Sequence, residues 1–191
     1  MIPQAQKALN SLLDGNNNFV NGRNLAIHRT VDDLKSMQFS QSPIACVVTC
    51  SDSRVIPELV FDKGFGDIFT VRCAGAVIGE NILESVEYAV KYLNVPLVMV
   101  LSHDDCGVMK KAKSMYPKEP DHLELLIRSV YEIIDSETEC YNELARDYTL
   151  TKKRKLLKRS EILRQMHHDG KFEIVRGYLN FDTGKVEIIN N

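Results

Sequence analysis

The chain has 191 residues, of which 44% are hydrophobic, and its formal net charge is -2. A chain of this length and composition can bury one substantial core, so we expect a single domain spanning residues 1–191. The near-neutral charge argues against a nucleic-acid-binding protein, because such proteins normally present a strongly basic face.

The first residues, MIPQAQKALNSLLDGNNNFVNGR, lack the basic start and the unbroken apolar block of a secretory signal. No later stretch approaches the length of a membrane span, which needs about 20 apolar residues. We therefore expect a cytoplasmic protein with no membrane partner. Its N-terminal part, over about residues 1–35, is expected to form a helical arm.

Strand and helix signals alternate through the middle of the chain. Apolar runs rich in β-branched residues predict strands at PIACVVTC, DIFTVRCA and VPLVMVLSH, which are residues 43–50, 67–74 and 95–103. A helix is predicted after each strand, at PELVFDKG, GENILESVEYAVKYLN and CGVMKKAKSMY. This alternation predicts an α/β fold with a mostly parallel central β-sheet flanked by helices.

The last third of the chain changes character. From Pro120 to about Met166 the pattern becomes helical and charged. The basic run KKRKLLKRSEILRQ at residues 152–165 contains interleaved leucines and an isoleucine, which suit one apolar helix face opposite a solvated basic face. We therefore expect no nucleic-acid partner.

The final stretch, KFEIVRGYLNFDTGKVEII, alternates like two strands around the turn signal Asp182-Thr183-Gly184-Lys185. It predicts an antiparallel C-terminal hairpin at an edge of the sheet.

The five cysteines, at positions 46, 50, 73, 106 and 140, form an odd and scattered set rather than a disulfide framework. In a reducing compartment such cysteines serve as metal ligands, reactive thiols or core packing. We expect Cys46, Cys73 and Cys140 to pack as small apolar groups.

Two of the predicted strands end in residues that bind metals. The first leads into VVTCSDSRV, which places Cys50 at its end, and the third leads into LSHDDCG, with His103 and Cys106. Carboxyl ends of parallel strands are where ligands bind in open α/β sheets, and zinc prefers thiolate and imidazole ligands. Although a lone buried cysteine is more often core packing, the three side chains together predict one zinc ion per chain.

Asp52 and Arg54 help to decide between a structural and a catalytic zinc site. A structural zinc is normally closed by a fourth Cys or His, which neither motif supplies, whereas a catalytic zinc keeps its fourth position for water. An exposed Asp-Arg pair on its own contributes only about 0–1 kcal/mol to stability. Next to Cys50, the pair favours a catalytic site. The H-x-E and P-C-x-x-C motifs of zinc deaminases and the G-x-G-x-x-G of dinucleotide sites are absent.

Taken together, C-S-D-S-R-V and H-x-x-C-G resemble the motifs of the β-class carbonic anhydrases, especially their bacterial branch. The likeness extends from LLDGNNNFVNGR through QSPIACVVTCSDSRVIPELVFDKGFGDIFTVRCAGAV and SVEYAVKYLNVPLVMVLSHDDCGVM to FEIVRGYLNFDTGKVEI. The resemblance implies zinc-dependent, reversible hydration of carbon dioxide to bicarbonate and a proton by zinc-bound hydroxide. It also implies a homo-oligomer, either a dimer or a dimer of dimers, with the active site near the subunit interface.

The resemblance further assigns roles to individual residues. Cys50, His103 and Cys106 match the zinc ligands, while Asp52 and Arg54 match the catalytic dyad. Residues that match the substrate pocket are Gln41, Phe69 and Tyr88, which the neighbouring chain supplies in plant-type members, and Gly107, whose backbone borders the pocket.

The resemblance implies two alternative positions for the Asp52 side chain. Paired with Arg54, it is held off the metal and accepts a hydrogen bond from the bound water. Released from Arg54, it takes the fourth zinc position, as in the closed state of several family members. Because two thiolates cancel the charge of Zn²⁺, we also expect an activity that rises on the alkaline side.

Three residues depart from the family pattern: Ser102 replaces a usual glycine, Ala76 a common asparagine, and Cys73 a usual asparagine or valine. They leave open a second enzymatic interpretation, a hydrolase of carbonyl sulfide or carbon disulfide on the same site. A third interpretation is a non-catalytic protein that zinc only stabilises.

Overall fold

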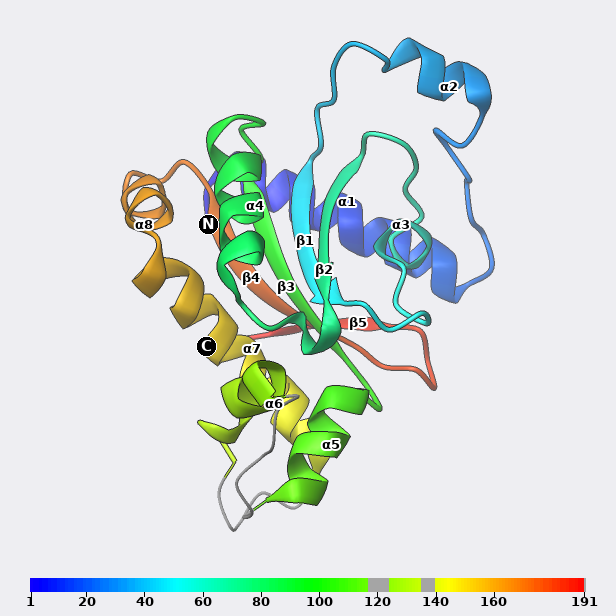
Figure 1. The fold of residues 1–191 in the computed structure, drawn as a ribbon. Coiled ribbons are helices and arrows are strands. Elements are labelled where there is room, and N and C mark those ends of the chain that lie inside the picture. Colours follow the sequence, from blue (N-terminus) through cyan, green and yellow to red (C-terminus); the bar gives the residue numbers. More distant parts are fainter. Residues whose placement is uncertain (117–123, 135–139, 191) are drawn as a thin grey trace.

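The computed structural model describes residues 1–116, 124–134 and 140–190. Within these residues the strands form one five-stranded sheet of order β2-β1-β3-β4-β5 (Figure 1). Its strands are β1 (Ala45–Cys50), β2 (Ile68–Cys73), β3 (Leu97–His103), β4 (Glu173–Leu179) and β5 (Val186–Ile189). All pairs are parallel except β4 with β5, which confirms the mostly parallel sheet and its antiparallel C-terminal edge hairpin.

Helices lie between and around these strands. They are α1 (Pro3–Val20), α2 (Val31–Ser36), α3 (Pro57–Val60), α4 (Glu80–Lys91), α5 (Gly107–Met115), α6 (Glu124–Tyr131), α7 (Tyr141–Arg159) and α8 (Glu161–His168), with a 3-10 turn at Ala74–Ala76. The predicted helix over residues 57–64 is shorter than expected because Asp62 adopts a φ of 47°. The predicted helical stretch from 120 to 166 contains α6, α7 and α8, and residues 117–123 and 135–139 lie outside the described chain.

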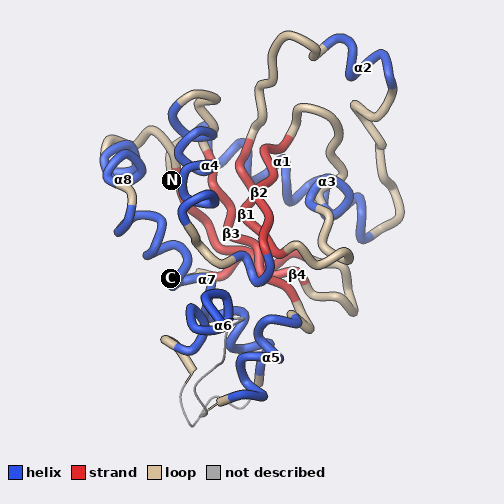
Figure 2. The backbone as a smooth tube through the Cα atoms, viewed as in Figure 1, coloured by secondary structure: helices blue, strands red, loops and turns tan. Residues whose placement is uncertain are grey.

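Successive residues of the central strands face opposite sides of the sheet, and both sides are covered (Figure 2). Val47 and Met99 belong to the core cluster that α1 and α3 cover, whereas Val48 and Val100 belong to the cluster that α4, α7 and α8 cover. A strand buried on both faces needs apolar residues at every position. This is why β1 and β3 read as unbroken apolar runs.

The expected N-terminal arm divides into two parts. Helix α1 is packed on the sheet, and its buried Asn16 donates hydrogen bonds to the carbonyls of Val60 and Gly184, at 3.1 and 2.9 Å. Helix α2 buries none of its residues and lies away from the sheet (Figure 1). Only the first part is therefore held by the core.

A separate group of helices lies beyond the carboxyl ends of the strands. Helices α5 and α6 and the start of α7 form a third apolar cluster, which includes Cys50 and Cys106. Farther along α7, Leu156 is buried as expected, but Lys152 is also only 2% exposed. The prediction of a fully solvated basic face is therefore wrong at Lys152. No helix among the described residues has both the length and the apolar content needed to span a membrane.

Candidate metal centre

The sheet topology brings the ends of β1 and β3 together. These strands are parallel neighbours, with Thr49 paired to Leu101, so Cys50 and His103 leave the sheet side by side. Cys106 follows after the turn at Asp104 and Asp105. The two sulfur atoms and the imidazole nitrogen of this buried trio lie within 4.8 Å of one another, a spacing that suits a bound metal ion.

The His103 ring is oriented by its own loop. Its Nδ1 lies 2.7 Å from the carbonyl oxygen of Asp104, and because a carbonyl only accepts, Nδ1 carries the proton. Nε2 is then a bare acceptor, and it is buried with no hydrogen-bond partner among the described residues. A buried nitrogen lone pair beside two thiols fits a zinc ligand, whose other nitrogen usually donates to such an acceptor.

Asp104 is itself fixed by the C-terminal hairpin. Its carboxylate accepts hydrogen bonds from the hydroxyl of Tyr178, at 2.6 Å, and from the backbone N–H of Phe181, at 2.8 Å. The Phe181 ring stacks on the His103 ring with a centroid distance of 5.3 Å. The C-terminal hairpin therefore holds the imidazole of His103 in place, in addition to forming the edge of the sheet.

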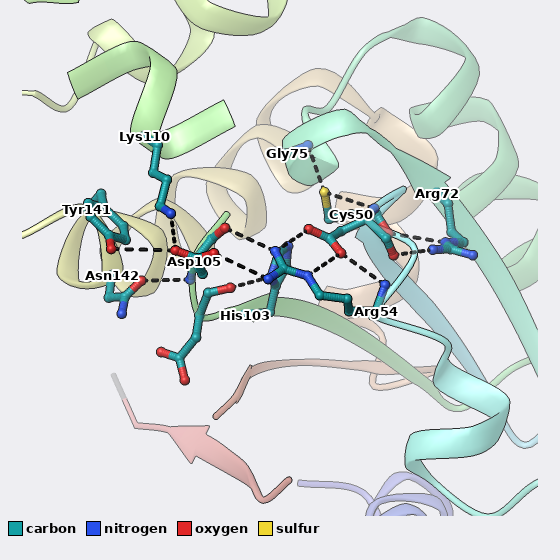
Figure 3. A network of polar contacts seen from close by, with 11 residues as sticks. Cys50, Arg54, Arg72, Gly75, His103, Asp105, Lys110, Tyr141 and Asn142 are labelled. Atoms are coloured by element: carbon teal, nitrogen blue, oxygen red, sulfur yellow. Dashed lines mark hydrogen bonds and ion pairs between the residues drawn. The ribbon is translucent and has the colours of Figure 1, made fainter. Parts of the chain in front are cut away.

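Backbone N–H groups surround the sulfur of Cys50. Gly75 donates to it at 3.2 Å and Asp52 at 3.4 Å (Figure 3). The hydrogen bond with the Cys106 thiol, followed by smaller contributions from His103 and these N–H groups, holds the pKa of Cys50 far below its usual range. The same contact, together with burial, raises the pKa of Cys106. Gly75 has a φ of 65°, and a Cβ there would lie 2.9 Å from the Val108 side chain, so this approach requires glycine.

The three candidate ligands line a cavity of about 10 Å³ together with Gly75, Ser102 and Lys152. A space of this size admits a single ion or water molecule. Lys152 donates a hydrogen bond to the Ser102 hydroxyl at 3.2 Å, and burial lowers the pKa of Lys152 to about 8. Ser102, one of the three residues that depart from the family pattern, is therefore the hydrogen-bond partner of the buried Lys152.

Asp52 and Arg54 form a two-pronged ion pair beside the trio. Arg54 donates to both carboxylate oxygens of Asp52, from Nε at 2.9 Å and from Nη2 at 2.8 Å (Figure 3). These hydrogen bonds outweigh partial burial and lower the pKa of Asp52 to about 2. Arg72 of β2 supports the same loop by donating to the carbonyls of Cys50 and Asp52, at 3.1 and 2.8 Å. In this structure Asp52 is in its Arg54-paired arrangement.

The expected pocket residues do not line this site within one chain. Phe69 pairs with Cys46, at the end of β1 opposite to Cys50, and its ring lies 6.1 Å from that of the exposed Tyr88. Gln41 is exposed in the segment before β1. Gly107 is exposed as the first residue of α5, directly after Cys106.

The remaining sequence departures and cysteines have local explanations. Ala76 is buried with a φ of 51°, a left-handed conformation that asparagine tolerates better than alanine. The Cys73 thiol donates to the Val77 carbonyl at 3.1 Å. Cys46 is fully buried, and Cys140 and Cys73 are half-buried. All five cysteines are free.

Sequence reasoning missed several residues that shape the site, among them Asp104, Asp105, Arg72 and Lys152. The two acids were visible as a doubled carboxylate inside H-x-x-C, but polar turn residues of this kind are common and carried no signal. Lys152 was hidden within a basic run.

A mostly parallel α/β sheet that presents two thiols and an imidazole at adjacent strand ends is the arrangement expected from the resemblance to the β-class carbonic anhydrases. The sequence model of the carbonic anhydrase family matches residues 45–186. The chain therefore belongs to this family, as its motifs indicated, and within it to the β class.

The chain is most clearly similar to bacterial relatives. It is 47% identical over 105 residues to carbonic anhydrase 2 of Mycobacterium tuberculosis, a match that covers 55% of this chain and 51% of the relative. It is also 47% identical over 107 residues to a carbonic anhydrase of Mycolicibacterium smegmatis, covering 56% of this chain and 52% of the relative. The match thus spans about half the length of each relative.

Solved structures share the fold. The β-carbonic anhydrase CcaA superposes with a TM-score of 0.65 at 25% identity, covering 95% of both chains. A structure from Sordaria macrospora, described as one of two tetrameric β-carbonic anhydrases, gives a TM-score of 0.67 at 19% identity, covering 83% of this chain and 86% of that one.

Proposed function

We propose that this chain is a zinc enzyme that interconverts carbon dioxide and bicarbonate, with Cys50, His103 and Cys106 as the ligands of one Zn²⁺ per chain. Asp52 and Arg54 are its catalytic dyad. The observation that carries the proposal is the buried Nε2 of His103, which lies beside two thiols and has no hydrogen-bond partner in the described part of the chain, with a carboxylate held close by an arginine.

Zinc, when bound, supplies a Lewis acid that generates a nucleophile from water near neutral pH. The chain's own residues then have separable tasks. Asp52 has its carboxylate kept ionised by Arg54, so it accepts a hydrogen bond from a water-derived group and orients it. Arg54 holds the Asp52 carboxylate in the ion pair, and a carboxylate released from Arg54 would be free to bind the metal and block the site.

We further propose that the substrate pocket is completed by a second copy of the chain. Gln41, Phe69 and Tyr88 lie away from their own metal site but are accessible or partly accessible to a neighbour, while Gly107 directly follows the candidate ligand Cys106. This proposal includes a dimer or a dimer of dimers, and a cytoplasmic protein without nucleic-acid or membrane partners.

The decisive experiment is stopped-flow hydration of CO₂ between pH 6.5 and 9 on protein of measured zinc content. Cys50→Ser is the blank, because it removes a thiolate ligand with little change of volume. We expect hydration in proportion to zinc, rising with pH, and absent from Cys50→Ser.

Zinc-replete protein without CO₂ hydration at any of these pH values would refute the proposal. The same samples are then assayed with carbonyl sulfide and carbon disulfide. Turnover of these compounds alone would support the sulfur-analogue hydrolase, and no turnover of any substrate would support a non-catalytic zinc protein.

A further inference from the structure

Asp52 and Arg54 belong to one short loop after β1. Their two hydrogen bonds fix the two side chains relative to each other, but not relative to His103 and Cys106, which follow β3. An ion pair within one loop can move as a unit. Some contact from the β3 loop is therefore needed to hold the dyad against the candidate metal centre.

Asp105 provides this contact. Nη1 of Arg54 donates to the Oδ2 atom of Asp105 at 3.2 Å, and Nη2 donates to the backbone oxygen of Asp105 at 3.3 Å (Figure 3). Asp52 uses Nε and one N–H of Nη2, so the two carboxylates bind different N–H groups of the guanidinium. Asp105 therefore anchors Arg54 and does not compete with Asp52 for it.

Asp105 is in turn held from three directions. Its Oδ1 atom forms an ion pair with the ammonium of Lys110 of α5 and lies 3.5 Å from the Tyr141 hydroxyl of α7. Its backbone N–H donates to the Asn142 side chain at 2.9 Å. The residue adopts a φ of 59°, a conformation that asparagine, aspartate and glycine tolerate best. Figure 3 shows this network running from α5 and α7 to Arg54.

A ring completes the enclosure of Arg54. The guanidinium carbon lies 4.6 Å from the centroid of Phe181, the same ring that stacks on His103. We infer that Asp105 is a positioning residue, which ties Arg54, and through it Asp52, to the loop that carries His103 and Cys106. The expected effect of Asp105 on CO₂ hydration rests on the proposed function. The expected effect of Asp105 on the order of the Arg54 side chain does not.

The first test uses Asp105→Gly, which removes the carboxylate and fits the left-handed backbone without strain. The readout is the order of the Arg54 Nε–H bond in solution, measured by ¹⁵N relaxation and assigned by its absence in Arg54→Ala. We expect this N–H to be rigid in the original chain and mobile in Asp105→Gly. Asp105→Asn keeps an acceptor for Nη1 and should restore most of the order.

The second test is a double-mutant cycle on CO₂ hydration by zinc-loaded protein. Asp105→Gly should lower kcat about fivefold, the upper end for loss of an exposed ion pair, with little change of KM. In the Arg54→Ala background the same substitution should have no further effect, because it acts only through Arg54. Asp32→Asn, which removes an exposed carboxylate paired with Lys35 on α2, is the matched control and should leave both readouts unchanged.

Two results would overturn the inference. One is an Arg54 Nε–H that stays rigid in Asp105→Gly, and the other is a fivefold fall of kcat when Asp105→Gly is added to Arg54→Ala. If Asp105→Gly fails to fold, Asp105→Ala, which also removes the carboxylate, takes its place in both tests. If the original chain does not hydrate CO₂, the proposed function fails, while the relaxation experiment still decides the role of Asp105.

Discussion

Lys152 lines the same small cavity as the three candidate metal ligands. Its ammonium is buried, with the Ser102 hydroxyl at 3.2 Å and the Tyr148 ring at 4.7 Å as neutral partners. Burial disfavours the charged form, and this effect outweighs the opposing influence of Cys106, Cys50 and Cys73, so that the pKa of Lys152 falls to about 8. In the unfolded chain an exposed lysine titrates near its ordinary value of about 10.4.

The free energy of unfolding should therefore rise with pH between about 8 and 10, since in this range the unfolded state binds the proton that the folded state has released. Lys152→Met removes this pH-dependent contribution to the free energy of unfolding. We predict that the stability of the variant relative to the original chain falls by about 3 kcal/mol between pH 7 and 10.5. Denaturant unfolding of both proteins at each pH measures the difference, and a constant difference would contradict it.

The Asp52-Arg54 pair leads to a different kind of prediction, because it lies at the surface of the site. Asp52→Asn and Arg54→Ala should each lose most turnover, about 100-fold or more for a group that orients the nucleophile, while zinc content stays at one per chain. Stopped-flow CO₂ hydration with metal analysis on the same samples checks both. Full activity in either variant would refute the dyad.

At the scale of helices and strands, the sequence predicted what local chemistry controls. The continuous apolar runs of β1 and β3 and the turn at Gly184 led directly to the observed strands and hairpin. The shortened α3 was not predictable, because Asp62 turns away to accept N–H groups of Leu25 and Ala26, far along the chain. The candidate ligands followed from the strand ends, whereas the roles of Asp105 and Lys152 depend on contacts between distant elements.

Helix capping offers a prediction that separates packed from unpacked elements. The Ser160 hydroxyl accepts the Leu163 N–H at the start of α8, whose Leu163 is buried. The Thr30 hydroxyl caps α2 in the same way, but α2 buries no residue. Ser160→Ala should therefore lower the global free energy of unfolding by about 1–2 kcal/mol.

Thr30→Ala is the matched control for this change. It should leave the global free energy of unfolding nearly unchanged and increase amide hydrogen exchange only within α2, since α2 can open by itself. Equal losses of global stability in the two variants would contradict the idea that α2 is independent of the core.

At the scale of the whole molecule, a metal at Cys50, His103 and Cys106 would add a bond between the loops that follow β1 and β3. A ligand that binds only the folded state at 100 times its Kd adds about 2.7 kcal/mol. For a chain of this size that corresponds to roughly 5–10 °C in Tm. We predict a fall of this size when zinc is removed by a chelator. Cys50→Ser should show no response to the chelator, and an equal response there would contradict the site.

The strand order also determines when such a site can exist during folding. In the sheet β1 lies beside β3, although β2 and α4 come between them in the chain. Likewise β3 pairs with β4, although the segment from α5 to α8 separates these two strands in the sequence. Parallel pairings between such distant segments form slowly, because long loops must close first. We predict that the ligand set is completed only after the main folding barrier, when the loops after β1 and β3 have both closed. Zinc should consequently leave the refolding rate unchanged and slow unfolding, so that the metal prolongs the lifetime of the native state without guiding its formation.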